Sequence, residues 1–147
     1  MEYYCYVNYY MTKMRVIIAD DSNLILERLQ EMISGYKRAE IVGTFKNGTD
    51  TLSALRILKP DLAIVDIVMP GLSGLEVLKA IRRENETLRF IIFTFHSSDY
   101  YRQMAIQSKV DHFFNKVDDF DNLKQVVAEM VLSFNKLRKL NYNNKTI

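Results

Sequence analysis

The sequence predicts a doubly wound α/β domain, in which helices cover both faces of a five-stranded parallel sheet. Two features of the chain lead to this prediction. From Met14 onward, short apolar runs of strand length alternate with longer amphipathic stretches of helical period. The short runs are almost continuously apolar, which is typical of parallel strands buried on both faces, because right-handed crossovers place helices there.

Five short runs are rich in β-branched or aromatic residues and have the length of strands. We expect strands over Arg15–Ala19 (RVIIA), Glu40–Phe45 (EIVGTF), Asp61–Val65 (DLAIV), Arg89–Thr94 (RFIIFT) and Asp111–Asn115 (DHFFN). Sheets of this kind bind ligands just beyond the carboxyl ends of their strands. The residues that follow these runs are therefore the first candidates for chemistry.

The intervening stretches carry apolar residues at helical spacing. The first helix is expected between Ser22 as its N-cap and Gly35 as its C-cap. The apolar stripes of the five helices comprise, in order, Ile25, Leu29, Met32 and Ile33; Leu52, Leu55 and Leu58; Val77, Leu78 and Ile81; Tyr101, Met104 and Ala105; and Phe120, Leu123, Val127, Met130, Phe134 and Leu137. We interpret these stripes as core rather than as ligand-binding surfaces.

At 147 residues the chain has room for one globular domain. Its start, MEYYCYVNYYMTK, holds five of the nine tyrosines and has neither helical nor strand periodicity. We therefore expect a poorly ordered N-terminal extension at 1–13, a folded domain at 14–140 and a C-terminal tail at 141–147. Residues 1–13 are interpreted either as a short extension or as the product of a rarely used upstream start.

The composition excludes several classes of function. The net charge of +2 gives no indication of a polyanionic partner. The single cysteine, Cys5, allows no internal disulfide, and with two histidines it assembles no Cys/His zinc site. The chain has no apolar run of about 18 residues and no signal peptide, so we expect a cytoplasmic protein without a membrane span.

Polar residues stand at the ends of four of the five predicted strands: Asp20 and Asp21, Asp66, Thr94, and Lys116. Carboxylates brought together at one edge of a sheet repel each other, so they need a cation or must bind protons. Oxygen ligands without Cys or His favour a hard divalent ion such as Mg²⁺. A carboxylate beside Mg²⁺ and a lysine is suited to phosphoryl transfer, which would give an aspartyl phosphate on Asp66.

Four motifs stand in register along the chain: IIADDS at 17–22, VDIVMPGLSG at 65–74, Thr94 and Lys116. An acidic pair followed by D-x-x-M-P-G-x-x-G, a threonine and a lysine is a specific combination, whereas each piece alone is weak. On these residues the chain resembles the receiver domain of two-component response regulators, over about residues 14–140. The resemblance implies a flavodoxin-like (βα)5 fold with strand order 2-1-3-4-5.

The resemblance also implies how a Mg²⁺ ion and a phosphoryl group would be bound. Asp66 would be the phosphoacceptor and a metal ligand. Asp21 would bind Mg²⁺ directly, Asp20 mainly through water, and the backbone carbonyl of Val68 would add a further ligand.

Three more residues match positions that respond to the phosphoryl group in this family. Lys116 would contact the phosphoryl group itself. Thr94 would form a hydrogen bond to it after phosphorylation and draw its loop inward. Phe113 matches the switch aromatic residue, which turns inward as that threonine moves.

The sequence departs from the family pattern at three places. Val117 follows Lys116 where the family often has a proline after a cis peptide bond; we expect a trans bond here, because a cis bond before a non-proline residue costs about 3–4 kcal/mol. Phe95 stands where a small side chain is usual and is expected to restrict access to the phosphoryl group. Val68 and His96 occupy positions that tune dephosphorylation, and the apolar Val68 favours a longer-lived phosphoryl state.

The leading hypothesis is a single-domain response regulator receiver and phosphoacceptor, with no enzymatic activity beyond catalysis of its own phosphorylation and dephosphorylation. It would take the phosphoryl group from a sensor histidine kinase or a histidine phosphotransfer protein. It would then pass the group on in a phosphorelay, or bind a downstream effector through the face formed by the fourth helix, fifth strand and fifth helix. We expect a monomer or weak dimer.

A second hypothesis is a phosphorylation-independent interaction module, in which Phe95 and the missing proline have disabled the switch. Direct DNA binding by this chain is not expected, because residues 117–147 form one helix and a tail and accommodate no helix-turn-helix. A flavin-binding function is set aside, because the first strand is not followed by a phosphate-binding loop of Ser, Thr and Gly.

Overall fold

Five strands form one sheet at the centre of the protein. They are β1 (Met14–Ala19), β2 (Ala39–Phe45), β3 (Leu62–Val65), β4 (Arg89–Thr94) and β5 (His112–Asn115). All neighbouring pairs are parallel and the spatial order is β2-β1-β3-β4-β5, so the predicted strand number and order are confirmed. The structure, a computed structural model, describes residues 12–145, with backbone alone for 135–143 and 145; most of the predicted extension at 1–13 lies outside the described residues.

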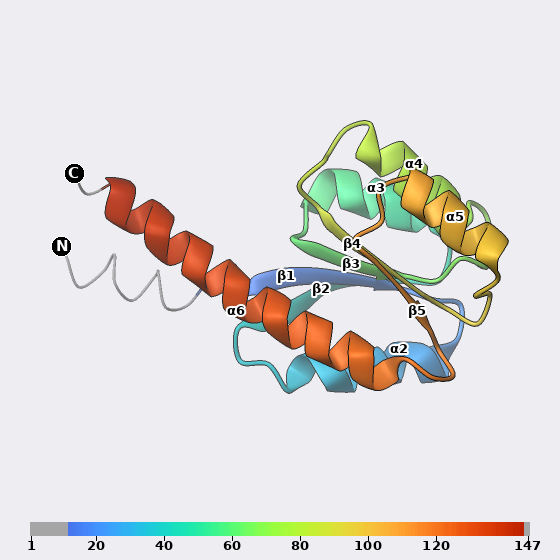
Figure 1. Cartoon of the computed structure of the whole chain (residues 1–147), viewed down its shortest axis with the longest axis horizontal. Helices are drawn as coiled ribbons and strands as arrows, with labels where there is room; N and C mark the ends of the chain where they lie inside the picture. Colours follow the sequence, from blue (N-terminus) through green and yellow to red (C-terminus); the bar gives the residue numbers. More distant parts are fainter. Residues whose placement is uncertain (1–11, 146–147) are drawn as a thin grey trace.

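Five helices connect and cover the strands. They are α2 (Asn23–Ser34), α3 (Gly48–Leu58), α4 (Gly74–Arg82), α5 (Asp99–Gln107) and α6 (Phe120–Lys145). Helices α2 and α6 lie on one face of the sheet, and α3, α4 and α5 lie on the other (Figure 1). The domain is therefore doubly wound, as the alternation of strands and helices predicts.

The two faces of the sheet have separate apolar cores. In β1, Val16 and Ile18 pack in the cluster shared with α2 and α6, whereas Ile17 packs in the cluster shared with α3, α4 and α5. The central strand β3 is buried along its whole length, LAIV. Burial on both faces explains why these strands are continuously apolar rather than alternating.

Helix α2 begins and ends where the sequence predicts. The Ser22 side chain accepts a hydrogen bond from the backbone N–H of Ile25, and Gly35 is the C-cap. Gly35 has a φ of −72°, a right-handed conformation open to any residue. The helix thus begins immediately after the acidic pair that follows β1.

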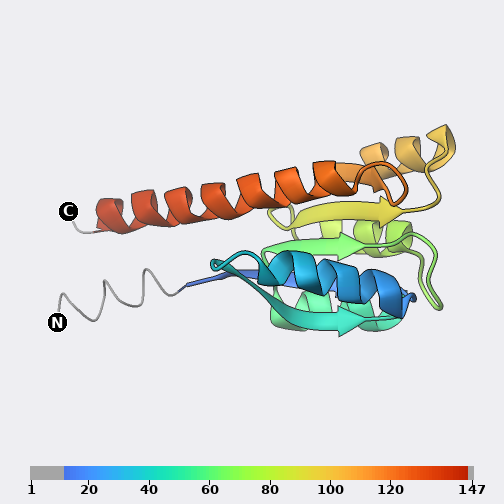
Figure 2. The same ribbon diagram turned by 90° about the horizontal axis from the view of Figure 1, so that it is seen from below.

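Helix α6 continues through Lys145 and extends beyond the amino-terminal ends of the strands (Figure 2). Its backbone thus reaches into the segment 141–147 that is expected from sequence to be a tail. The stretch 120–145 contains no Gly or Pro that would end a helix. None of the helices within residues 12–145 is both long and apolar enough to cross a membrane.

The loop between β3 and α4 places Asp66 at the edge of the sheet. Gly71 has a φ of +75°, which favours glycine. At Gly74, the backbone N–H donates to the carbonyl of Ile67 at 2.8 Å, and an added Cβ would lie 2.0 Å from the carbonyl oxygen of Asp66. Backbone therefore packs directly on backbone at Asp66, the residue that is expected from the resemblance to be the phosphoacceptor.

We predict that Gly74→Ala lowers the free energy of unfolding by more than about 2 kcal/mol, because the new methyl group meets rigid backbone rather than a movable side chain. Urea denaturation followed by circular dichroism measures the loss. Gly35→Ala is the matched control, since its Cβ would meet its nearest atom, the Met32 carbonyl oxygen, at 3.3 Å. We expect the control to change stability by less than about 1 kcal/mol. Equal effects of the two substitutions would contradict the close approach at Gly74.

Candidate functional site

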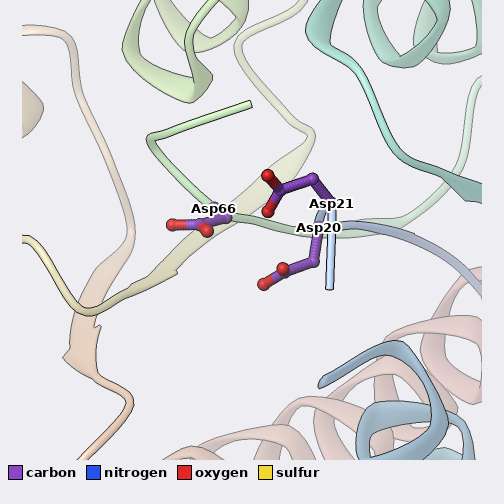
Figure 3. Close-up of side chains that lie close together, drawn as sticks. All are labelled: Asp20, Asp21 and Asp66. Carbon is purple, nitrogen blue, oxygen red and sulfur yellow. The ribbon is translucent and has the colours of Figure 1, made fainter. Parts of the chain in front are cut away.

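Three aspartates come together at the carboxyl edge of the sheet. Asp20 and Asp21 follow β1, and Asp66 follows β3; the strands are adjacent, and the Asp66 N–H donates to the carbonyl of Ala19 at 3.0 Å. One carboxylate oxygen from each aspartate lies within 4.8 Å of the other two (Figure 3). Asp20 and Asp66 are buried, whereas Asp21 is exposed. The cluster is therefore open to solvent on the side of Asp21.

Lys116 forms ion pairs with the two buried carboxylates. Its Nζ lies 2.5 Å from Oδ2 of Asp20 and 2.8 Å from Oδ2 of Asp66, and its side chain is 2% exposed. The Lys116 backbone N–H donates to the carbonyl of Thr94 at 2.9 Å, which anchors the lysine to the end of β4. A buried ammonium of this kind neutralises much of the repulsion between the carboxylates. The contact with Asp20 was not predicted from sequence.

Backbone N–H groups orient the remaining oxygens of the same two carboxylates. Oδ1 of Asp66 accepts a hydrogen bond from Ile67 N at 2.7 Å, and Oδ1 of Asp20 accepts one from Ser22 N at 2.9 Å. Both carboxylates thus have one oxygen held by backbone and the other by Lys116. This leaves little rotational freedom in either side chain.

Burial raises the pKa of the Asp20 carboxyl above its ordinary value of 3.8. The hydrogen bonds from Lys116 and Ser22 oppose this shift, and the charge of Asp66 adds to it. A carboxyl whose pKa is raised by folding binds its proton more tightly in the folded state. Its contribution to stability is therefore present below pH 3.8 and is lost as the pH rises through the raised pKa.

The residues at the end of β4 form one wall of the site. Thr94 is fully buried, and its Oγ1 accepts a hydrogen bond from the backbone N–H of His96 at 3.1 Å. The Phe95 side chain is 59% exposed, and its ring centroid lies 4.9 Å from Nζ of Lys116. The bulky ring noted in the sequence therefore lies against the lysine, in a cation–π contact.

The remaining predicted site residues, Val68 and Phe113, lie at the exposed rim of the site and on β5. The Val68 side chain is 47% exposed, two positions beyond Asp66. Phe113 is partly buried in the cluster shared with α3, α4 and α5, and the guanidinium carbon of Arg102 lies 4.7 Å from its ring centroid. Its neighbour Phe114 packs on the opposite face of the sheet, as the alternation of a strand requires.

The loop that follows Lys116 has a feature that was not predicted from sequence. All peptide bonds of the described residues are trans, which confirms the expectation for the bond between Lys116 and Val117. The Asn115 side chain accepts a hydrogen bond from Val117 N at 2.7 Å and donates one to Ser97 Oγ at 2.6 Å. The Asn115 side chain thus bridges the loops that follow β5 and β4. The one sequence signal for this bridge is an asparagine before the lysine together with a non-proline residue after it.

Comparison with known families identifies this arrangement. Residues 16–128 match the response regulator receiver domain family, and this range covers most of the chain. The chain belongs to this family. Its fold and the motifs at its strand ends agree with the resemblance inferred from the sequence.

Curated relatives of this receiver domain are longer proteins. It is 24% identical over 116 residues to the response regulator GacA of Pseudomonas aeruginosa, covering 79% of this chain and 54% of that protein. It is 37% identical over 84 residues to a protein-glutamate methylesterase/protein-glutamine glutaminase of Clostridium acetobutylicum, covering 57% of this chain and 24% of that protein. The chain thus spans between about a quarter and about half of these relatives.

Solved structures give the same result for the fold. A DNA-binding response regulator of the LuxR family from Staphylococcus aureus superposes with a TM-score of 0.73 at 29% identity, covering 79% of this chain and 97% of that chain. The response regulator domain of Thermotoga maritima CheB superposes with a TM-score of 0.72 at 25% identity, covering 84% of this chain and 97% of that chain.

We predict that Lys116→Met destabilises the receiver domain by about 3 kcal/mol at neutral pH in the presence of EDTA, because Asp20 and Asp66 lose their buried counter-ion. The loss should be smaller at about pH 5, where carboxyls left without a counter-ion take up protons more readily. Urea denaturation at the two pH values measures both effects.

Lys79→Met is the matched control, because Lys79 is an exposed lysine on α4. We expect it to change stability by less than about 0.5 kcal/mol at either pH. A loss in Lys116→Met that is as small as in the control, or that does not depend on pH, would contradict the role given to the ion pairs.

Proposed function

We propose that this receiver domain accepts a phosphoryl group on Asp66, from a histidine kinase or a histidine phosphotransfer protein. The observation that carries the proposal is the buried Asp66 carboxylate, held 2.8 Å from the Lys116 ammonium beside two further acidic groups. A carboxylate oxygen of Asp66 would attack phosphorus while the bond to the donor nitrogen breaks. The domain proposed to do this comprises residues 14–140.

We propose Mg²⁺ as the cofactor of the reaction. The donor set fits this ion, because the clustered ligand atoms are all carboxylate oxygens and one carboxylate is open to solvent. Asp21, Asp66 and the backbone carbonyl of Val68 would hold the ion directly, and Asp20 mainly through water. When bound, the ion supplies positive charge that neutralises the phosphoryl oxygens.

Lys116 and Thr94 would stabilise the phosphorylated state. The Lys116 ammonium is already beside Asp66, so it needs to move little to contact a phosphoryl oxygen. The Thr94 hydroxyl would exchange its bond with His96 N for one to the phosphoryl group and draw its loop inward. Phe113 would follow that movement, since it lies on the neighbouring strand.

Three side chains at the rim would set the lifetime of the phosphoryl group. Val68 presents no polar atom that could position a water molecule for hydrolysis. The exposed ring of Phe95 lies over Lys116 and would hinder the approach of water and of small phosphodonors. His96 is exposed beside them and would act in either direction, by binding water or by excluding it.

The output surface is proposed to be the face of α5, β5 and α6. Helix α5 carries exposed apolar side chains, among them Tyr100 and Met104, which are 67% and 38% exposed and, at four residues apart, lie on the same side of the helix. Exposed apolar residues close together are typical of surfaces that bind another protein. We propose a cytoplasmic monomer or weak dimer that binds a downstream effector or relays the phosphoryl group.

We predict that incubation with Mg²⁺ and acetyl phosphate, or with Mg²⁺ and a phosphorylated histidine donor, adds one phosphoryl group to the protein. Intact-mass measurement detects the addition, and EDTA should prevent it. Asp66→Ala should remove it, because the attacking oxygen is absent. Asp61→Ala is the matched control, since Asp61 lies at the opposite end of β3.

Absence of labelling with both kinds of donor would show that the domain is not a phosphoacceptor. Partner binding that is unchanged by Asp66→Ala would then favour the alternative, a phosphorylation-independent interaction module. Labelling that persists in Asp66→Ala would place the acceptor elsewhere.

We predict that about 10 mM MgCl₂ raises the melting temperature of the wild-type protein by a few degrees, because a bound ion stabilises the folded state by mass action. Asp21→Asn should lose most of this rise, because it removes one direct ligand at an exposed position. Asp99→Asn, at the start of α5, is the control and should keep the rise. Differential scanning calorimetry with and without the ion measures these shifts. Equal shifts in the wild type and in Asp21→Asn would exclude Asp21 as a ligand.

A further inference from the structure

The carboxamide of Asn115 joins two loops at the carboxyl edge of the sheet. Its Oδ1 accepts a hydrogen bond from Val117 N at 2.7 Å, and its Nδ2 donates one to Ser97 Oγ at 2.6 Å. The orientation of the amide is determined chemically, because a backbone N–H can only donate and must face the oxygen. One side chain therefore spans the loop after β5 and the loop after β4.

The backbone on both sides of this bridge is held in place. Thr94 and Asn115 are directly paired in the sheet, and the N–H of Lys116 donates to the carbonyl of Thr94. The Asn115 N–H donates to Oδ2 of Asp119 at 2.9 Å, and the Asp119 N–H donates back to the Asn115 carbonyl at 3.0 Å. A fixed backbone at Asn115 gives its side chain a fixed direction, so the bridge restrains Lys116 from both sides.

The bridge depends on the residue that follows the lysine. Val117 is 72% exposed, so its side chain contributes little packing. What it supplies to the bridge is a backbone N–H, which a proline would lack. The trans bond before Val117 and the hydrogen bond from its N–H together define the course of the loop. In this chain Asn115 thus restrains the loop after Lys116 through the backbone N–H of Val117.

We propose that Asn115 is a positioning residue for phosphorylation: it ties the loop of Lys116 to the loop that follows Thr94, so that the Lys116 ammonium is held where it reaches the phosphoryl oxygens. The proposal rests on the proposed function and adds a further residue to it. Asn115 does not contact the phosphoacceptor in this arrangement. It acts through the position of Lys116.

The test is the rate of phosphorylation of Asp66 by acetyl phosphate with Mg²⁺, followed by intact mass. Asn115→Ala should be slower by about tenfold, the effect of losing one or two ordinary hydrogen bonds from a positioned group. Asn115→Asp should retain a rate within about threefold of wild type, because its carboxylate still accepts from Val117 N and can accept from the Ser97 hydroxyl. Asn122→Ala, which removes a side chain bonded to Asp119, is the control and should keep the wild-type rate.

Two further measurements separate positioning from a general structural effect. In a Lys116→Met background, Asn115→Ala should cause no additional slowing, because the group that it positions is absent. Hydrogen exchange provides a readout independent of phosphorylation. The Val117 amide should be protected in the wild type and lose its protection in Asn115→Ala, while the Asp66 amide, bonded to the Ala19 carbonyl, stays protected in both.

The outcomes distinguish this inference from the proposed function. A wild-type protein that takes up no phosphoryl group from acetyl phosphate or from a phosphorylated histidine donor overturns the proposed function, and hydrogen exchange at Val117 then still tests the bridge. A phosphorylated wild type with Asn115→Ala equally fast overturns the inference alone. So does a slowing by Asn115→Ala that is equal in the wild-type and Lys116→Met backgrounds, or an Asn115→Asp variant as slow as Asn115→Ala.

Discussion

The ammonium group of Lys116, buried between Asp20 and Asp66, is the interaction on which the site depends. Two carboxylates held this close in a buried place would repel each other strongly, and the raised pKa of Asp20 reflects its burial. The Lys116 ammonium, which pairs with both carboxylates, offsets this repulsion and holds them close together. In the proposed function, a divalent ion would take over the charge of the lysine beside Asp20, and the lysine would turn to a phosphoryl group on Asp66.

The fold makes this arrangement possible because the carboxyl ends of all five parallel strands lie on the same side of the sheet. The aspartates follow β1 and β3 near the centre of the sheet, and the lysine follows β5, the outermost strand. Close backbone packing at Gly74 fixes the loop behind Asp66. The aspartates and the lysine thus directly follow strands of the sheet. The residues proposed to move or to control access lie nearby: Thr94 ends β4, Phe95 is in the loop after β4, and Phe113 is on β5.

Much of the fold and of the site could be predicted from the sequence, because both leave periodic or local signals. Continuous apolar runs indicated the parallel strands, and the acidic residues after them pointed to the carboxyl edge. The contact between Lys116 and Asp20 could not be predicted, because it depends on how far a flexible side chain reaches from the end of β5, past β4 and β3, to the end of β1. The hydrogen bonds of Asn115 could not be predicted for a similar reason. An asparagine at the end of a strand is common, and only the folded structure places Ser97 and Val117 N within reach of its side chain.

The central claim is that Lys116 exchanges its partners when Asp66 is modified. A crystal structure of the protein with Mg²⁺ and beryllofluoride, a stable mimic of the phosphoryl group, tests it most directly. We expect beryllofluoride on Asp66, Mg²⁺ bound by Asp21 and Asp66, and the Lys116 ammonium moved from Asp20 to a fluorine atom. A structure in which Lys116 remains paired with Asp20 while Asp66 carries the mimic would contradict the claim.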